Sequence, residues 1–273
     1  MINFLLKIPH YALRVFEKLK LEKHSKTFSS FDQAKEYCNS INPESYENDE
    51  LNTYRYEKFI NNLDLIPIAY SNSHKLLLET FLIYLQFEKQ LPKILDVGGV
   101  FGENQIYLKH LLKKDIIYDV VECEKIVSLS KEKKFNHSKF FANISLAKEN
   151  SRYDIIFSSG TVQYFKEPYK IIDEIFSMQA KFVGLSRNNF SDQEKIYSEP
   201  SYIENHGGNE GHIDFKHGKS KKVILYANTQ INEGKLIKIS QKHNYQLFRK
   251  SKGLEGNYGQ DSYTNDLVFK LSR

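Results

Sequence analysis

Apolar positions recur at helical spacing through most of the first 90 residues. Residues 3–22 combine this spacing with interleaved lysine and arginine, which predicts a basic amphipathic helix. Such a helix packs on its own domain or at a dimer interface, or it adheres to a partner or to an anionic membrane surface. Ser30 and Gln33 have the spacing of a capping box and predict a second, short helix, and residues 50–62 and 73–88 predict two more.

The pattern changes beyond Pro92, where short apolar runs alternate with segments of helix length. The runs are KILDVGG, DIIYDVVECE, YDIIFSSG and KFVGLSR. Strands that alternate with helices predict βαβ units around a parallel sheet. We therefore expect an α/β protein with two parts, an N-terminal helical segment over residues 1–70 and a larger domain over residues 71–273.

The last third of the chain departs from this alternation. Residues 191–222 are polar and rich in Gly, His, Asn and Lys, and they are too long for a routine connection, so we expect a mobile loop inserted in the domain. After it, VILYANTQ and a helical segment lead to YQLFRK, a glycine-rich loop and NDLVFKLS. This ending predicts an antiparallel hairpin at the edge of the sheet.

Composition adds few constraints. The formal net charge is +5, but the lysines are scattered among many acids rather than gathered in a stripe, so we expect no nucleic acid partner. Cys38 and Cys123 provide neither a disulfide framework nor a metal-type pair, which favours a reducing cytoplasm. No apolar run reaches the length of about 20 residues that spans a membrane. Lys7, His10 and Arg14 interrupt the apolar start before a secretory signal develops.

The strongest local signal is KILDVGGVFGENQIYLKHLL, a strand that runs through a glycine-rich turn into a helix. Gly98, Gly99 and Gly102 let the backbone take unusual dihedral angles and let a ligand approach closely. Asp96 at the strand end can accept a hydrogen bond from an amine or fix the turn. Structural turns also use glycine, so this pattern alone leaves a nucleotide-type site and a plain turn open.

A second acid favours the ligand-binding interpretation. Glu122 ends the next predicted strand, directly after Val120 and Val121 and 26 residues beyond Asp96. A carboxylate at this point can hold both hydroxyls of a ribose, whereas the alternative is an ordinary surface charge. Its position at the end of an apolar run favours the ribose.

In order along the chain, DVGGVFG, VVECE, FFANIS and YDIIFSSGTVQYFKEP resemble the cofactor-binding segments of class I S-adenosylmethionine-dependent methyltransferases, over about residues 92–187. SSFDQAKEYC, DVGGVFG and VGLSRNNF also look like methyltransferases encoded in bacterial O-antigen and capsule polysaccharide gene clusters. The resemblance implies a Rossmann-like, doubly wound α/β fold with a mainly parallel seven-stranded sheet, an antiparallel edge hairpin and an N-terminal helical segment. It also implies S-adenosyl-L-methionine as cofactor and S-adenosyl-L-homocysteine as product.

Carried onto this chain, the resemblance implies a set of cofactor and acceptor contacts. The turn would face the methionine moiety, the second acid the ribose, the FFANIS segment the adenine edge and the SSG segment the sulfonium. In that order the cofactor residues are Asp96, Gly98, Gly99 and Gly102, then Glu122, then Asn143 and Ile144, then Ser159 and Gly160. Gln163 and Tyr164 would follow the fourth strand on the acceptor side.

Val100 departs from the family pattern, which usually has a glycine in the middle of this turn. A β-branched residue would be strained there if the site required positive φ. Either the turn differs or the cofactor sits in an altered position, and a catalytically inactive relative is an alternative.

Transfer of a methyl group to a hydroxyl needs a base. The polar segment ENHGGNEGHIDFKHG offers His206, His212, Asp214 and His217, and a His–Asp pair can take the proton near neutral pH. We predict His212 as the base, with Asp214 and Tyr164 as catalytic partners and His206 in contact with the acceptor. The same cluster could bind a divalent metal, but no ligand pair has the rigid spacing of a metal site, and we predict no metal.

Arg187 follows a predicted strand at the carboxyl end of the sheet, where ligands bind. It can pair with an acceptor phosphate or carboxylate, or it makes a structural ion pair. The resemblance alone suggests the acceptor, an oxygen on a sugar or an activated sugar precursor of a bacterial surface polysaccharide. The alternatives are an NAD-dependent oxidoreductase acting on a nucleotide sugar and a catalytically silent binding protein that keeps the fold.

Overall fold

The computed structural model describes residues 20–42, 45–68, 72–135, 137–206, 221–253 and 262–272. Its main sheet consists of β2 (Ile94–Val97), β3 (Tyr118–Val121), β4 (Phe140–Phe141), β5 (Ile155–Ser159), β6 (Phe182–Phe190), β9 (Tyr245–Lys252) and β10 (Tyr263–Leu271). These seven strands lie in the order β4-β3-β2-β5-β6-β10-β9. Strands β2 to β6 are parallel, and β10 runs antiparallel to both of its neighbours. The predicted mainly parallel sheet with an antiparallel edge hairpin is confirmed.

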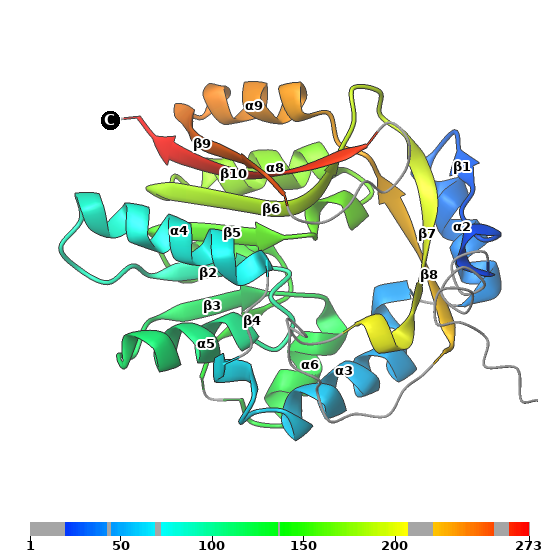
Figure 1. Ribbon diagram of the computed structural model, residues 1–273, viewed down its shortest axis with the longest axis horizontal. Coiled ribbons are helices and arrows are strands. Elements are labelled where there is room, and N and C mark those ends of the chain that lie inside the picture. Colours follow the sequence, from blue (N-terminus) through cyan, green and yellow to red (C-terminus); the bar gives the residue numbers. More distant parts are fainter. Residues whose placement is uncertain are drawn as a thin grey trace, which may run out of the picture.

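Helices cover both faces of this sheet (Figure 1). Alternating strand residues supply the two faces, so Ile94 and Ile155 pack on one side while Leu95 and Ile156 pack on the other. The first side is covered by α4 (Asn72–Phe87) and α5 (Glu103–Leu112). The second side is covered by α7 (Ile144–Asn150), α8 (Pro168–Ser177) and α9 (Glu233–Lys242). The sheet is therefore doubly wound, as the resemblance implied.

The described N-terminal part is mostly helical, as predicted. It contains α2 (Phe31–Ile41), α3 (Asp49–Asn61) and short 3-10 turns at Ser45–Glu47 and Ile66–Ile68. The Ser30 side chain accepts a hydrogen bond from the Gln33 amide at 3.3 Å, which confirms the predicted cap. Residues 3–19 of the predicted basic helix lie outside the described residues, so that helix stays a prediction.

A second, smaller sheet contains β1 (Thr27–Phe28), β7 (Ile196–Tyr202) and β8 (Val223–Thr229), paired antiparallel in the order β1-β7-β8. The prediction of a loop throughout residues 191–222 is therefore wrong at β7. Its sequence IYSEPSY carries a proline and a charge and reads as polar, and it becomes a strand because two distant segments pair with it. Residues 207–220 lie outside the described part of the chain.

The small sheet lies beyond the carboxyl ends of β2, β3 and β5, on the right of Figure 1. Helix α2 packs against β7 and β8, and Leu51 of α3 shares a buried cluster with Ile203, Ile224 and Tyr226. The described N-terminal segment is thus joined to the larger domain by a shared core. It covers the edge of the sheet at which ligands bind in this type of fold.

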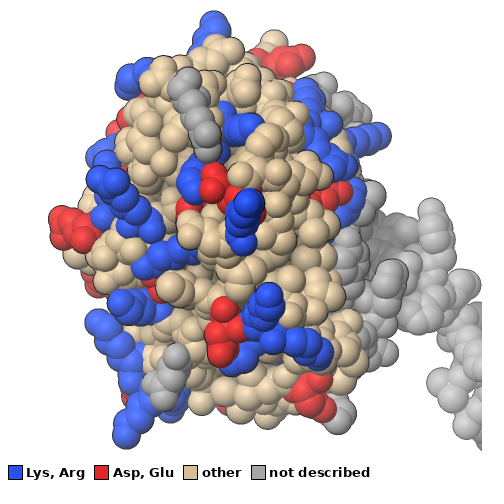
Figure 2. Space-filling model, turned by 90° about the vertical axis from the view of Figure 1, so that its left-hand side faces the viewer, with Lys and Arg blue, Asp and Glu red and all other residues tan. Residues whose placement is uncertain are grey.

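The opposite end of the molecule faces the viewer in Figure 2, where lysines and arginines are interspersed with acids and uncharged residues. No helix within the described ranges combines the length and apolar character needed to span a membrane.

Candidate active site

A cavity of about 1900 Å³ lies between the main sheet and the small sheet. The chain leaves β2 toward β3 and β4 on one side and later returns to place β5 and β6 on the other side. Doubly wound sheets bind ligands at the carboxyl ends of the strands where the order reverses in this way. The lining of this part comes from Asp96, Gly98, Gly99, Glu122, Asn143, Ile144, Ser159 and Gly160, all of them predicted cofactor residues.

The glycine-rich turn passes very close to the loop that follows β5. Gly98 has φ +86°, and a Cβ there would lie 2.0 Å from Thr161 Oγ1. At Gly99 a Cβ would lie 2.6 Å from the carboxylate oxygen Oδ2 of Asp96. Only glycine fits at these two positions, because any side chain would push the ends of β2 and β5 apart or displace Asp96.

Two buried carboxyl groups flank this turn. Oδ2 of Asp96 accepts hydrogen bonds from the Tyr118 hydroxyl at 2.6 Å and from the Asn104 amide at 2.9 Å. Burial raises the pKa of Asp96 to about 6 despite these bonds. Burial also raises the pKa of Glu103 to about 7, while its Oε2 accepts from the Phe101 amide at 3.2 Å. Both carboxyl groups therefore titrate near neutral pH.

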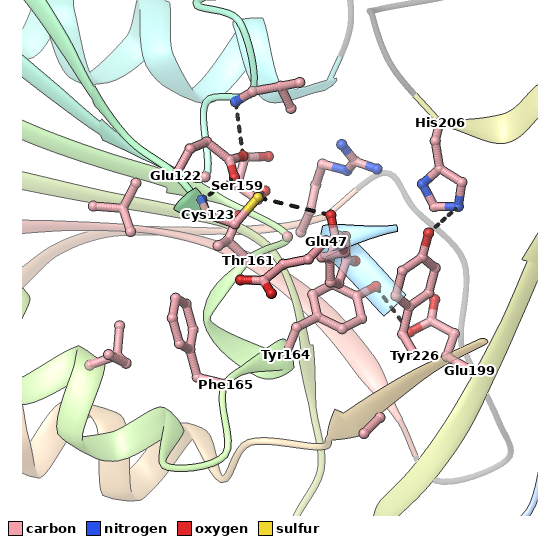
Figure 3. Close-up of a pocket in the computed structure, with 18 of the residues that line it drawn as sticks. Glu47, Glu122, Cys123, Ser159, Thr161, Tyr164, Phe165, Glu199, His206 and Tyr226 are labelled. Atoms are coloured by element: carbon pink, nitrogen blue, oxygen red, sulfur yellow. Dashed lines mark hydrogen bonds between the residues drawn. The ribbon is translucent and has the colours of Figure 1, made fainter. Parts of the chain in front are cut away.

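The Glu122 carboxylate is held at the end of β3 by two backbone amides. Oε1 accepts from Val100 at 3.1 Å and Oε2 from Cys123 at 2.9 Å, the first shown as a dashed line in Figure 3. Val100 has φ +46°, so the strain predicted for a β-branched residue in this turn is present. The turn keeps a left-handed conformation that favours glycine, and the amide of the strained residue orients Glu122.

Three polar atoms around the turn have no hydrogen-bond partner within the described residues. They are Ser159 Oγ, Glu103 Oε1 and Asn104 Oδ1, which are buried and belong to residues that line the cavity. Buried polar atoms are normally paired, so these three atoms would gain hydrogen bonds from a polar ligand in the cavity. Farther along, the Asn143 side chain caps α7 by accepting from the Leu146 amide at 2.9 Å.

On the side of the small sheet, the cavity is lined by a cluster of three tyrosines, Tyr46, Tyr164 and Tyr226. The Tyr46 ring stacks on Tyr226 at 4.2 Å between centroids and meets Tyr164 edge-on at 5.0 Å. The Tyr164 hydroxyl donates to Glu199 Oε2 at 3.0 Å, and Figure 3 shows these two side chains pointing toward each other. The Asn228 amide donates to the same carboxylate oxygen.

Burial dominates the titration of this tyrosine cluster and its neighbours. It raises the pKa of Tyr164 well above its ordinary value, and the negative charge of Glu199 adds to the effect. His206, whose Nε2 lies 3.2 Å from the Tyr226 hydroxyl, has its pKa lowered to about 3 by burial and then by nearby cations. His206 is therefore a neutral imidazole at pH 7.

The predicted acceptor residues are distributed unevenly around the cavity. Tyr164, Arg187 and His206 line it. Gln163 does not, because its side chain is buried and its Oε1 accepts from the Asn189 amide at 2.7 Å, which ties it to β6. Gly102, predicted in the cofactor site, also lies outside the lining, since it is the N-cap of α5 and faces the side chains of residues 137 and 138. His212, Asp214 and His217 lie outside the described residues.

Sequence reasoning missed Tyr46, Arg55, Glu199 and Tyr226, all of which line the cavity. Arg55 sits within a predicted polar helix and Glu199 within a predicted loop, so neither had a local signal. Residues 199 and 226 pair across β7 and β8, and only this long-range pairing brings them together.

No family model matches the sequence, and no curated protein sequence matches it. Several solved structures are similar to this chain at low identity. Magnesium protoporphyrin IX methyltransferase from Synechocystis PCC 6803 with bound SAH is 15% identical, with a TM-score of 0.45 over 73% of this chain and 83% of that one. A methyltransferase from Clostridium acetobutylicum is 13% identical, with a TM-score of 0.49 over 80% of this chain and 99% of that one. The CcbJ methyltransferase from Streptomyces caelestis is 12% identical, with a TM-score of 0.47 over 74% of this chain and 90% of that one. The chain's function is therefore inferred from the residues of its own cavity.

Proposed function

We propose that the protein is an S-adenosylmethionine-dependent methyltransferase. The observation that carries this proposal is the meeting of Asp96, Glu122 and Ser159 at the ends of three neighbouring strands around one cavity. Asp96, Ser159 and Glu122 match, in that order, the amino acid, the sulfonium and the ribose of the cofactor.

The residues present fit this cofactor. The carboxyl groups of Asp96 and Glu103 lie where an ammonium group would find acceptors. Glu122, oriented by two amides, would hold the ribose hydroxyls. The bound sulfonium supplies an electrophilic methyl group, so the protein chiefly has to align the acceptor with it and exclude water.

The tyrosine cluster and Glu199 provide the acceptor side. Glu199 accepts the hydroxyl proton, and Tyr164, already hydrogen-bonded to that carboxylate, positions the hydroxyl. The predicted His212–Asp214 pair remains the second candidate for this base.

The acceptor we propose is a hydroxyl of a sugar or an activated sugar precursor. Aromatic rings beside carboxylate and amide groups offer both the apolar and the hydrogen-bonding surface that a sugar presents. The resemblance to methyltransferases of polysaccharide gene clusters supports a precursor of a bacterial surface polysaccharide.

An NAD-dependent oxidoreductase is less well supported. A dinucleotide site of the Rossmann type uses two mononucleotide-binding halves of parallel strands. Here β6 is followed in the sheet by the antiparallel hairpin β10-β9, which takes the place of a second parallel half.

Calorimetry with S-adenosylmethionine, S-adenosylhomocysteine and NAD tests the proposal. We expect micromolar binding of the first two, weakened at least tenfold in Asp96→Ala and Glu122→Ala and unchanged in Glu149→Gln, whose carboxylate is exposed on α7. A folded protein that binds neither sulfur compound, or that prefers NAD, would overturn the proposal. Binding without methyl transfer to any acceptor in a broad sugar screen would instead favour a catalytically silent relative.

A further inference from the structure

We infer that the acceptor carries an anionic group, a phosphate or a carboxylate, which binds between Arg55 and Arg187. The inference rests on the proposed function, because it assigns chemistry to the acceptor half of the same cavity. Both arginines line this cavity. They reach it from different elements, Arg55 from α3 and Arg187 from β6.

Arg55 is buried but incompletely satisfied. Its side chain is only 6% exposed, and its guanidinium lies 5.3 Å from the centre of the Tyr46 ring. Its Nε is buried and has no hydrogen-bond partner within the described residues. A buried donor left without a partner is costly, and a guanidinium lining a cavity is well suited to an anionic oxygen from a ligand.

Arg187 is held in an unusual backbone conformation within β6 (Phe182–Phe190), at a bulge where Ser186 and Arg187 lie opposite Asp266 of β10. Its φ is +55°, which is rare for a residue other than glycine, and such strain concentrates at functional sites. Gly160 lies against it, since a Cβ at residue 160 would stand 3.5 Å from the Arg187 Cβ. The exposed side chain thus sits on the cavity wall beside the predicted sulfonium residues.

Three cations act on the buried His206 side chain. Arg55, Lys58 and Arg187 all act to lower the pKa of His206, after the larger effect of burial. Lys58 donates to the carbonyl oxygens of residues 204 and 206 at 3.4 Å, so it serves the local backbone. Of these three cations, Arg55 and Arg187 line the cavity and Lys58 does not.

We assign the anion to the acceptor, although the charge of Arg55 also acts on Glu103 and Glu122 in the cofactor half of the cavity. Arg55 packs on Tyr46, and the same ring contacts Tyr164, the partner of Glu199. An anion held by the arginines is therefore close to the group that accepts the hydroxyl proton. The planar guanidinium group of an arginine can donate two parallel hydrogen bonds to the paired oxygens of a phosphate or a carboxylate. The ammonium group of a lysine lacks this geometry.

Calorimetric titration of inorganic pyrophosphate and of malonate tests this inference, with and without saturating S-adenosylhomocysteine. We expect submillimolar binding of at least one anion, and the preferred one tells phosphate from carboxylate. Arg55→Gln and Arg187→Gln should each weaken it at least tenfold, and Arg55→Lys, which keeps the charge without the fork, about fivefold. Affinity for S-adenosylhomocysteine should stay within twofold. Lys35→Gln, which removes a cation from α2 on the same cavity, is the matched control and should change neither affinity.

Three outcomes would overturn the inference. The first is that neither anion binds the unmodified protein, and the second is that both arginine variants bind the anion normally. The third is that Arg55→Gln loses affinity for S-adenosylhomocysteine, which would assign Arg55 to the cofactor carboxylate. If Arg55→Gln does not fold, the exposed Arg187→Gln decides. If the protein binds the anion through the arginines but does not bind S-adenosylhomocysteine, the anion site is supported and the methyltransferase proposal is rejected.

Discussion

The cavity has a floor and a roof that are built in different ways. The floor consists of the carboxyl ends of β2, β3 and β5 with the turns that follow them, and each part is a contiguous strand–turn unit. The roof consists of the small sheet with α2, α3 and the turn at Ser45–Glu47, assembled from three segments far apart in the chain. The floor holds buried carboxyl groups and a strained turn, whereas the roof presents tyrosines and Arg55.

This difference separates the two proposed binding tasks. Cofactor affinity should depend on the floor, while acceptor affinity and proton removal should depend on the roof and its contacts with Tyr164. Substitutions that change one property and not the other are therefore the sharpest tests of the comparison.

The largest effect is expected for Gly98→Ala in the floor. The new Cβ would meet Thr161 Oγ1 at 2.0 Å, at a φ of +86°. We expect the free energy of unfolding to fall by about 3 to 5 kcal/mol and S-adenosylhomocysteine binding to be lost. Chemical denaturation and calorimetry measure both. Gly234→Ala in α9 is the control, with a change below about 1 kcal/mol. A Gly98→Ala protein of normal stability and affinity would contradict the close approach of β2 and β5.

The second effect is a pH dependence of stability that arises in the floor. The pKa values of Asp96 and Glu103 rise from 3.8 and 4.5 to about 6 and about 7 on folding. The folded chain then binds more protons than the unfolded chain, so these groups make the free energy of unfolding fall as pH rises from about 4 to about 7. For Asp96 alone the loss is about 3 kcal/mol.

Denaturant unfolding at a series of pH values, with and without S-adenosylhomocysteine, measures this dependence. Asp96→Asn should flatten the profile, and the ligand should bind more tightly as the carboxyl groups ionise and attract its ammonium. Identical pH profiles for the variant and the unmodified protein would contradict the raised pKa of Asp96.

The third effect belongs to the roof. Glu199→Gln removes the negative charge that accepts from Tyr164 and Asn228. With an acceptor identified by screening, we expect kcat to fall about 100-fold while affinity for S-adenosylhomocysteine stays within twofold. Glu194→Gln, whose carboxylate pairs with Tyr169 and Lys235 outside the cavity, should leave kcat unchanged. An equal loss in both variants would reject Glu199 as the proton acceptor.

The smallest effect is expected for Val100→Gly. Glycine removes the strain at φ +46°, a gain of about 1 to 2 kcal/mol, which the lost packing of a partly buried valine and the greater freedom of the unfolded chain largely offset. Stability should change by less than about 1 kcal/mol. Affinity for S-adenosylhomocysteine should stay equal or rise up to fivefold. A tenfold loss of affinity would mean that the valine itself contributes to the cofactor site.

Local sequence was sufficient for much of the floor. Hydrophobic periodicity predicted β2, β3 and β5 because each is a short apolar run that stays buried on both faces. Asp96 and Glu122 could be placed together because carboxyl ends of parallel strands meet at one edge of the sheet. Val100 could be recognised as strained because it stands where the family that the chain resembles usually has a glycine, and a β-branched residue is disfavoured at positive φ.

Only the tertiary structure decided the roof. Strand β7 exists because β1 and β8 supply its hydrogen-bond partners, and no local pattern in IYSEPSY records that pairing. The same pairing brings Glu199 and Tyr226 together, and Arg55 lines the same cavity from α3. Gln163 was predicted to contact the acceptor but turns toward β6, because the backbone amide of Asn189 offers its side chain a buried hydrogen bond. A sequence records the preferences of neighbouring residues, whereas contacts between distant segments depend on how the whole chain packs.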